Sequence, residues 1–146
     1  MKKLFLIACA LMASVSMYAF DFDGINLNGT VGEITKAVAK KNYVTSIEDP
    51  NTLTGLCQGT KISLKFNLED VTEKNRVGQL IVDVPTTSAN AYLDNAQLLN
   101  VIYHQVSNSS AGFLYELDAD GTTLLLSKTD NGIRLTYNTP YYKEKK

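Results

Sequence analysis

The chain has 146 residues, of which 45% are hydrophobic and 20% charged, with 14 Lys+Arg, 15 Asp+Glu and one His. This length and composition are those of one globular domain and exclude a disordered or collagen-like chain. The formal net charge of -1 argues against a nucleic-acid binder, and the single His excludes a zinc site built from several histidines.

The first nineteen residues have the pattern of a bacterial secretory signal peptide (1–19). Lys2 and Lys3 supply the positive charge, an apolar stretch runs over 4–12, and small residues follow it. We expect cleavage after Ala19, with cleavage after Ser16 as the alternative. Because the apolar stretch is shorter than the roughly 20 residues that span a bilayer, it predicts export rather than a transmembrane anchor. The mature chain is then one domain over 20–146, either periplasmic or secreted.

Both cysteines bear on this location. Residues 6–9 (Leu-Ile-Ala-Cys) resemble a lipobox, which would make Cys9 a lipid anchor, although only eight residues would precede the cut. Cleavage after Ala19 instead removes Cys9, so we expect Cys57 to be the only thiol of the mature chain, with no internal disulfide. The neighbours of Cys57 favour a small, partly buried hydrophobic residue; a reactive thiol or an intermolecular disulfide are the alternatives.

The first element predicted in the mature chain is a helix over 31–42. Thr30 precedes Glu33 by three residues, which is the spacing of a capping box, and apolar residues then recur at helical intervals. A short strand over 43–47 follows the helix, and the turn residues 48–51 end that strand.

Two strands are predicted next. Residues 60–68 alternate cleanly, with apolar side chains on one face and Lys61, Ser63 and Lys65 on the other, which indicates a half-buried strand. A polar loop separates this strand from a second one over 77–84.

A second helix over roughly 89–106 is predicted from apolar residues at three- and four-residue steps. Strands over 113–118, 122–128 and 133–137 follow, joined by Asp-Gly and Asn-Gly turns. We therefore expect an α+β fold with two layers, in which two helices cover one face of an antiparallel sheet of about five strands, in the order α-β-β-α-β-β-β. The other face of the sheet is expected to be open to solvent or to a partner.

No residue pattern predicts catalysis or a cofactor. Residues 118–121 (Asp-Ala-Asp-Gly) begin like a calcium loop, but the later ligand positions are apolar or neutral, so a hairpin turn explains them better. His104 has no serine in a nucleophile-elbow sequence to activate, and a helix C-terminus explains a cation there. The acidic pairs lie in polar loops, and the chain has no Trp on which a sugar could stack.

The eight tyrosines of the sequence are its most suggestive feature. Tyr137, Tyr141 and Tyr142 cluster around Pro140 near the C-terminus, and tyrosine is favoured in protein interfaces. The alternative is that Tyr137 faces the core while Tyr141 and Tyr142 pack the tail against the sheet.

Residues 22–30 (Phe-Asp-Gly-Ile-Asn-Leu-Asn-Gly-Thr), followed by a helix and Lys41-Asn42-Tyr43, resemble the opening of a group of small exported bacterial proteins. Their order of elements is similar to the beta-lactamase-inhibitor-protein-like fold and to the small SmpA/OmlA outer-membrane lipoproteins. The resemblance implies an exported role in binding or assembly. No functional residue transfers with it, and fold alone does not establish function.

These observations favour a non-enzymatic protein-interaction module of the bacterial cell envelope, which binds an envelope protein through its open sheet face or a strand edge. The alternatives are a small envelope hydrolase or small-ligand carrier, and a structural subunit of an envelope assembly. The sequence leaves the oligomeric state open. The candidate partner-binding residues are Lys61, Ser63, Lys65, Tyr141 and Tyr142.

Overall fold

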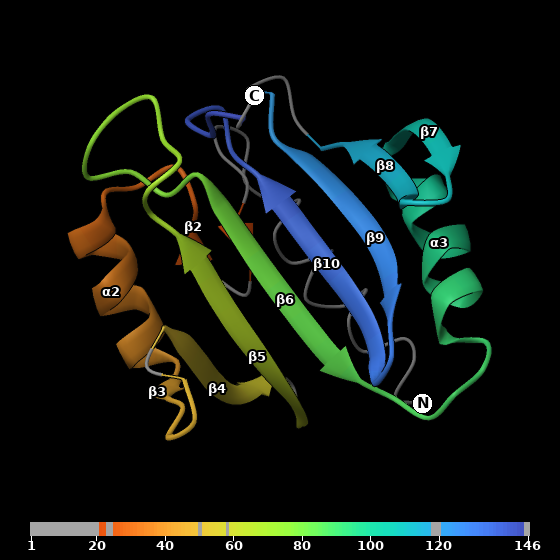
Figure 1. Cartoon of the computed structure of the whole chain (residues 1–146), viewed down its shortest axis with the longest axis horizontal. Helices are drawn as coiled ribbons and strands as arrows, with labels where there is room; N and C mark the ends of the chain where they lie inside the picture. Colours follow the sequence, from red (N-terminus) through yellow and green to blue (C-terminus); the bar gives the residue numbers. More distant parts are fainter. Residues whose placement is uncertain (1–20, 23–24, 50, 58, 118–120, 145–146) are drawn as a thin grey trace.

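The computed structural model describes residues 21–22, 25–49, 51–57, 59–117 and 121–144. Its main feature is one antiparallel sheet of eight strands in the order β3-β4-β5-β6-β10-β9-β8-β7 (Figure 1). A separate two-stranded hairpin, β1–β2, precedes the first helix. The elements are β1 Asp21–Phe22, β2 Ile25–Asn26, α2 Val31–Lys40, β3 Val44–Thr45, β4 Thr52–Cys57, β5 Thr60–Asn67, β6 Gln79–Pro85, α3 Ala91–Ile102, β7 His104–Ser109, β8 Gly112–Glu116, β9 Thr123–Thr129 and β10 Gly132–Asn138.

The same arrangement of elements occurs twice along the chain. Helix α2 is followed by the four strands β3–β6, and helix α3 is followed by the four strands β7–β10. We call residues 31–85 the N-terminal unit and residues 91–138 the C-terminal unit. The units join where β6 pairs with β10, with Val82 opposite Leu135 and Asp83 opposite Arg134. The first strand of each unit therefore forms an edge of the sheet.

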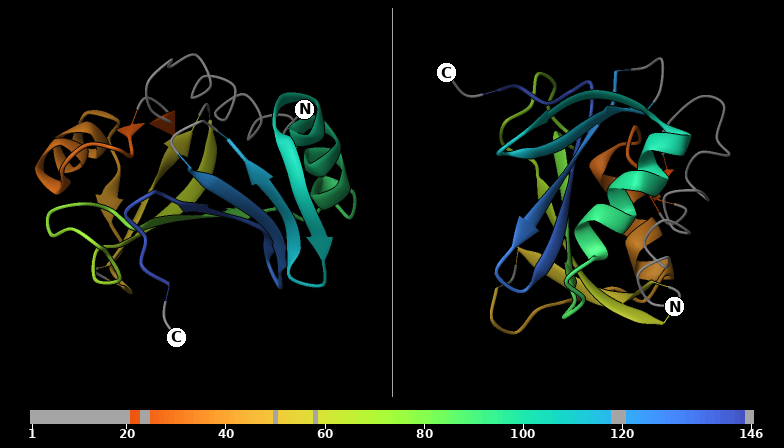
Figure 2. Two further views of the ribbon diagram at one scale, coloured as in Figure 1. Left: turned by 90° about the horizontal axis from the view of Figure 1, so that it is seen from above. Right: turned by 90° about the vertical axis from the view of Figure 1, so that its right-hand side faces the viewer.

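The core lies on one face of the sheet, where alternate side chains of neighbouring strands meet in register. One row runs from Leu64 through Val82 and Leu135 to Leu126, and each of these side chains is at most 2% exposed. Both helices and the β1–β2 hairpin contribute buried residues to this core, and Figure 2 shows them on the same side of the sheet. The opposite side of the sheet, which faces the viewer in Figure 1, carries no helix among the described residues.

The predicted α+β layout of about five strands in the order α-β-β-α-β-β-β is wrong, because the main sheet has eight strands. Strand β4 was missed because its residues Thr-Leu-Thr-Gly-Leu-Cys include a glycine and lack strong alternation. Strand β7 was missed because it is a polar edge strand whose first half continues the helical spacing of α3. The helix ends at Ile102 instead of reaching residue 106, and Tyr103 is already extended, with φ -120° and ψ 160°.

The capping box predicted for the first helix is confirmed. The Thr30 hydroxyl accepts a hydrogen bond of 3.2 Å from the Glu33 amide, and the Glu33 carboxylate accepts one of 2.9 Å from the Thr30 amide. The amide hydrogen bond lowers the pKa of Glu33 below its ordinary value. Helix α2 thus begins at a position that its own sequence fixes, and it buries Ile34 and Val38.

Cys57, at the end of β4, is 1% exposed and disulfide-bonded in the uncleaved chain. The expected lone thiol belongs to the chain cleaved after Ala19 and stays a prediction. Cys9, the other cysteine of the sequence, lies outside the described residues, as does the predicted signal peptide over 1–19. Most of the calcium-like segment 118–121 also lies outside them. No helix in the described part of the chain is long and apolar enough to cross a membrane.

Candidate functional site

The face of the sheet opposite the core, which we call the open face, carries a row of aliphatic side chains across its centre. Ile81 on β6 and Leu125 on β9 lie on either side of Thr136, and Leu114 on β8 lies opposite Leu125. All three aliphatic side chains are half-buried. We call Ile81, Leu114 and Leu125 the apolar row. The charged Lys65 on β5 lies directly opposite Ile81, at the end of the apolar row.

A fixed ion pair lies on one side of the apolar row. Asp83 and Arg134 are opposite residues of β6 and β10, and two parallel hydrogen bonds of 2.7 and 3.1 Å join the guanidinium to the carboxylate. The hydrogen bond to Asp83 raises the pKa of Arg134 above its ordinary value. Ser63 lies opposite Asp83, and Ser127 lies opposite Arg134. This bidentate geometry holds both charged groups in one orientation at the junction of the two units.

A ladder of amide side chains lies on the other side of the apolar row. The Asn67 amide nitrogen donates to the Gln79 side-chain oxygen at 3.0 Å, and Gln79 in turn donates to Asn138 at 2.8 Å. Asn67 also donates to the Asp70 carboxylate at 3.0 Å. These bonds link β5, β6 and β10 across the open face. The open face therefore consists of an aliphatic centre between two rows of polar groups whose orientations are fixed.

The predicted binding residues of β5 lie on this face. Lys61 and Lys65 are exposed and Ser63 is half-buried, and Lys65 lines a hollow of about 400 Å³ at the end of the open face. The hollow combines the Ile81 side chain with the polar groups of Gln79 and Asp70.

The structure places Tyr141 and Tyr142 in a different setting, against the loop 68–78. Both are half-buried; the Tyr141 ring lies 5.0 Å from the Arg76 guanidinium, and its carbonyl accepts a hydrogen bond of 2.8 Å from the Thr72 amide. Tyr142 forms an isolated β-bridge with Val71. The two tyrosines therefore fasten the C-terminal tail to this loop, whose first residues border the hollow beside Lys65.

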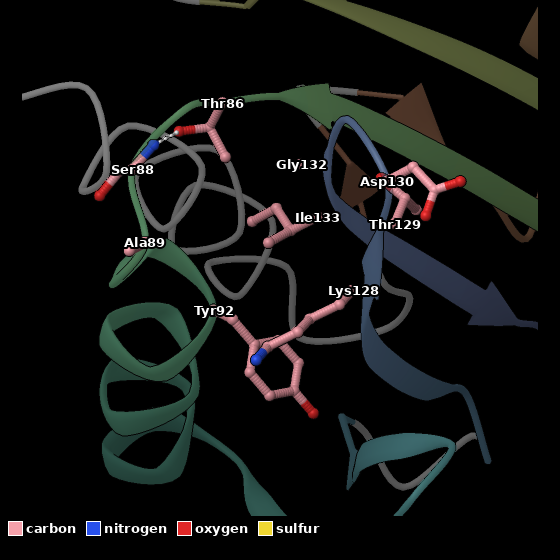
Figure 3. Close-up of a pocket in the computed structure, with 9 residues that line it drawn as sticks. All are labelled: Thr86, Ser88, Ala89, Tyr92, Lys128, Thr129, Asp130, Gly132 and Ile133. Carbon is pink, nitrogen blue, oxygen red and sulfur yellow. Dashed lines mark hydrogen bonds between the residues drawn. The ribbon is translucent and has the colours of Figure 1, made fainter.

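A smaller pocket of about 200 Å³ lies between the start of α3 and the β9–β10 turn (Figure 3). In it the Lys128 ammonium lies 4.9 Å from the centre of the Tyr92 ring, and the Thr86 hydroxyl accepts a hydrogen bond of 3.1 Å from the Ser88 amide. Burial raises the pKa of Tyr92. These contacts order the loop that leads into α3, and they pair no nucleophile with a base.

His104, the only histidine, is exposed on edge strand β7 opposite Glu116. A general base needs a reacting group within hydrogen-bond reach, and no hydrogen bond joins the His104 side chain to another of the described residues. Among the described residues, no three His, Cys, Asp or Glu side chains group as metal ligands.

An apolar groove of about 290 Å³ lies between α2 and the neighbouring strands. Ile34 and Val38 line it from the helix, and Leu53 and Phe66 line it from β4 and β5. The groove shares Phe66 and Leu68 with the polar hollow beside Lys65.

The sequence indicated the polar face of β5 but not the apolar row or the ion pair. Gln79 and Asp83, which lie on the same side of β6, are the signals that this strand also has a solvent face. Asp83 pairs with Arg134 on β10, and Ile81 shares the apolar row with Leu125 on β9. No local sequence pattern identifies which strands lie side by side.

Comparison of the chain with family models, with curated proteins and with solved structures finds no match. No family is assigned, and the resemblance to the beta-lactamase-inhibitor-protein-like fold stays a prediction.

Proposed function

We propose that this chain is an exported, non-enzymatic protein-interaction module of the bacterial cell envelope, and that the open face of its sheet binds a protein partner. The observation that carries this proposal is the apolar row of Ile81, Leu114 and Leu125, which lies between the Asp83–Arg134 ion pair and the amide ladder.

This pattern matches the anatomy of protein interfaces, in which an apolar centre is surrounded by a polar rim. The polar groups here already hold one another in place, so binding would cost little side-chain entropy. Lys61 and Lys65 lie at one side of the face and favour a partner with acidic residues there.

A matched pair of substitutions tests the binding surface. Ile81→Lys places a charge in the apolar row, whereas Ile47→Lys changes a fully exposed isoleucine in the turn before β4. The wild-type mature chain would be used to capture a partner from the native envelope, and the affinity of the purified pair would then be measured. We expect Ile81→Lys to weaken binding about tenfold or more, which corresponds to about 1.4 kcal/mol, and Ile47→Lys to leave it unchanged.

Circular dichroism and the unfolding midpoint show whether Ile81→Lys remains folded. Equal affinities of the wild type and a folded Ile81→Lys variant would remove the open face as the binding site. The absence of any captured partner would overturn the interaction role itself.

Export is tested separately. The basic, apolar and small-residue order of the first nineteen residues supports removal of a signal peptide after Ala19. We expect the intact mass of the protein recovered from the periplasm or medium to match a chain that begins at Phe20. Recovery of the full-length chain from the cytosol would contradict this.

The apolar groove beneath α2 favours one second candidate function, a carrier of a small apolar ligand. Its volume of about 290 Å³ is at the lower end of ligand pockets, and its lining is mainly aliphatic and aromatic. We expect an apolar fluorescent dye to bind the mature chain, and Val31→Trp, at the groove, to reduce that binding. Equal dye binding by both proteins would remove the groove as a ligand site.

A further inference from the structure

The two edges of the sheet differ in how much backbone they leave available for pairing. Strand β3 forms one edge and has only two residues, Val44–Thr45. Strand β7 forms the other edge and has six, His104–Ser109, five of which are exposed. In the described part of the chain, β7 has a neighbouring strand only on the side of β8. Because unpaired N–H and C=O groups of an edge strand accept another strand, β7 is the edge that is open to pairing.

The surroundings of β7 are unusually poor in charge. Across residues 86–115, which include α3, β7 and most of β8, the only acidic or basic side chains are Asp94 and His104. One further charged residue, Glu116 at the end of β8, lies opposite His104. Natural edge strands are commonly protected by lysine or proline, and β7 has neither. β7 has a β-bulge between Gln105 and Ser107, and Val106 in it is 48% exposed. Depletion of charge is typical of the buried centre of an interface.

Helix α3 contacts β7 and continues this uncharged surface. Its outer side presents two exposed aliphatic side chains, Leu93 at 55% and Val101 at 84% exposed. Exposed positions of α2, in contrast, carry Glu33, Lys36 and Lys40. The two helices hold equivalent places in their units. The scarcity of charged side chains is therefore specific to the α3–β7 side and is not a general property of this helix position.

We propose that β7 pairs with the β7 strand of a second copy of this chain, giving a dimer with one continuous antiparallel sheet. A partner for this edge must supply an extended strand. Its surface must also carry few charges, because the α3–β7 side of this chain offers few charged groups to pair with them. The chain itself supplies both. When two β7 strands pair antiparallel along their whole length, His104 of one copy lies opposite Ser109 of the other, so no like charges oppose one another. Antiparallel pairing of identical edges also gives the closed twofold symmetry that most homodimers have.

This dimer would place both open faces on the same side of the joined sheet, because the twofold axis of antiparallel pairing is perpendicular to the sheet. Two copies of the apolar row would then face the same direction. A partner with repeated sites could engage both of them, which raises the apparent affinity without any new contact.

The matched substitutions Val106→Lys and Val44→Lys test this proposal. Both valines are exposed, and they lie on opposite edges of the sheet. Light scattering and sedimentation equilibrium of the mature chain would be measured over a concentration series reaching about 1 mM, which detects even weak dimers. We expect the mass of the wild type and of Val44→Lys to approach twice that of a monomer, and Val106→Lys to remain at the monomer mass.

Hydrogen exchange of the wild type keeps the proposal testable if Val106→Lys does not fold. We expect β7 amides to become protected as concentration rises, while β3 amides do not. A wild type that is monomeric throughout the series would overturn the proposal. So would a dimer in which Val44→Lys, but not Val106→Lys, prevents association, or in which β7 exchange is independent of concentration.

Discussion

The N-terminal and C-terminal units have the same order of elements but stabilise their helices in different ways. Helix α2 begins with the reciprocal hydrogen bonds of Thr30 and Glu33 and carries its lysines on exposed positions. Helix α3 begins at Ala91, and the side chain of its N-cap residue Asn90 makes no capping hydrogen bond. Its buried Asn95 donates to the Ala91 carbonyl, and the Ala96 carbonyl accepts a hydrogen bond from Tyr115 on β8.

The comparison shows that one topology can be specified by local signals or by contacts between distant residues. The start of α2 is encoded within four residues of sequence. The position of α3 depends on contacts with the sheet below it. The exposed side chains of α3 are therefore not needed to position the helix. Substitutions in both units test this comparison.

The largest effect is expected from Leu135→Ala at the junction of the units. Leu135 is 2% exposed and lies opposite Val82 on one side and Leu126 on the other. Truncating it leaves a cavity in the shared core, and we expect a loss of about 2–5 kcal/mol in the free energy of unfolding. Chemical denaturation measures the loss, and hydrogen exchange reports each unit separately. If β8 amides exchange while β5 amides stay protected, the units are independent and do not share one core.

A smaller loss is expected from Gly55→Ala in the N-terminal unit. A β-carbon at Gly55 would overlap the ring of Tyr43, which is 5% exposed between α2 and β3. We expect a loss of about 1–3 kcal/mol because the ring must move in a packed core. The control is Gly32→Ala in α2, where the nearest atom is 3.9 Å away. It should stabilise the chain by about 0.5–1 kcal/mol, and a loss in the control would contradict the described packing.

Tyr115→Phe tests the tie between the sheet and α3. The hydroxyl of Tyr115 donates to the Ala96 carbonyl at 3.1 Å, and burial raises its pKa to about 12. Removing the donor should cost about 1–2 kcal/mol near neutral pH.

The same substitution has a pH signature. Because the folded-state pKa of Tyr115 lies above its ordinary value of 10, its contribution to stability is complete below pH 10 and is lost as pH rises toward 12. We therefore expect Tyr115→Phe to lose less stability than the wild type between pH 10 and 12. Equal losses in the two proteins would show that this hydroxyl is not buried.

The smallest pair of effects compares the two helix starts. Thr30→Ala should cost about 1 kcal/mol because it removes the acceptor of the Glu33 amide. Asn90→Ala should cost at most a few tenths, because the Asn90 side chain makes no capping hydrogen bond. Thermal unfolding of both variants measures the difference. Equal losses would mean that α3 is capped in solution as α2 is.

Glu33 adds an acid-dependent check on α2. Its folded-state pKa is lowered below 4.5, chiefly by the Thr30 amide, so its stabilising effect is present above pH 4.5 and is lost as pH falls through the folded-state value. Glu33→Gln should remove this part of the acid sensitivity, and an unchanged acid profile would contradict the capping box.

Features encoded by neighbouring residues could be predicted from the sequence, and those encoded by strand pairing could not. The Thr30–Glu33 box and the alternation through Lys61, Ser63 and Lys65 each depend on residues within one element. Strand β7 has no alternation to reveal it. The Asp83–Arg134 pair joins residues of different units, and its register is set by the whole sheet.

Site-specific photo-crosslinking in intact cells tests the role of the open face most directly. A photoreactive residue at Leu125 would lie in the apolar row, and one at Lys36 would lie on the exposed side of α2. The proposed function predicts that Leu125 gives an adduct with one envelope protein and that Lys36 gives none. An adduct from Lys36 but not from Leu125, or no adduct from either position, would contradict it.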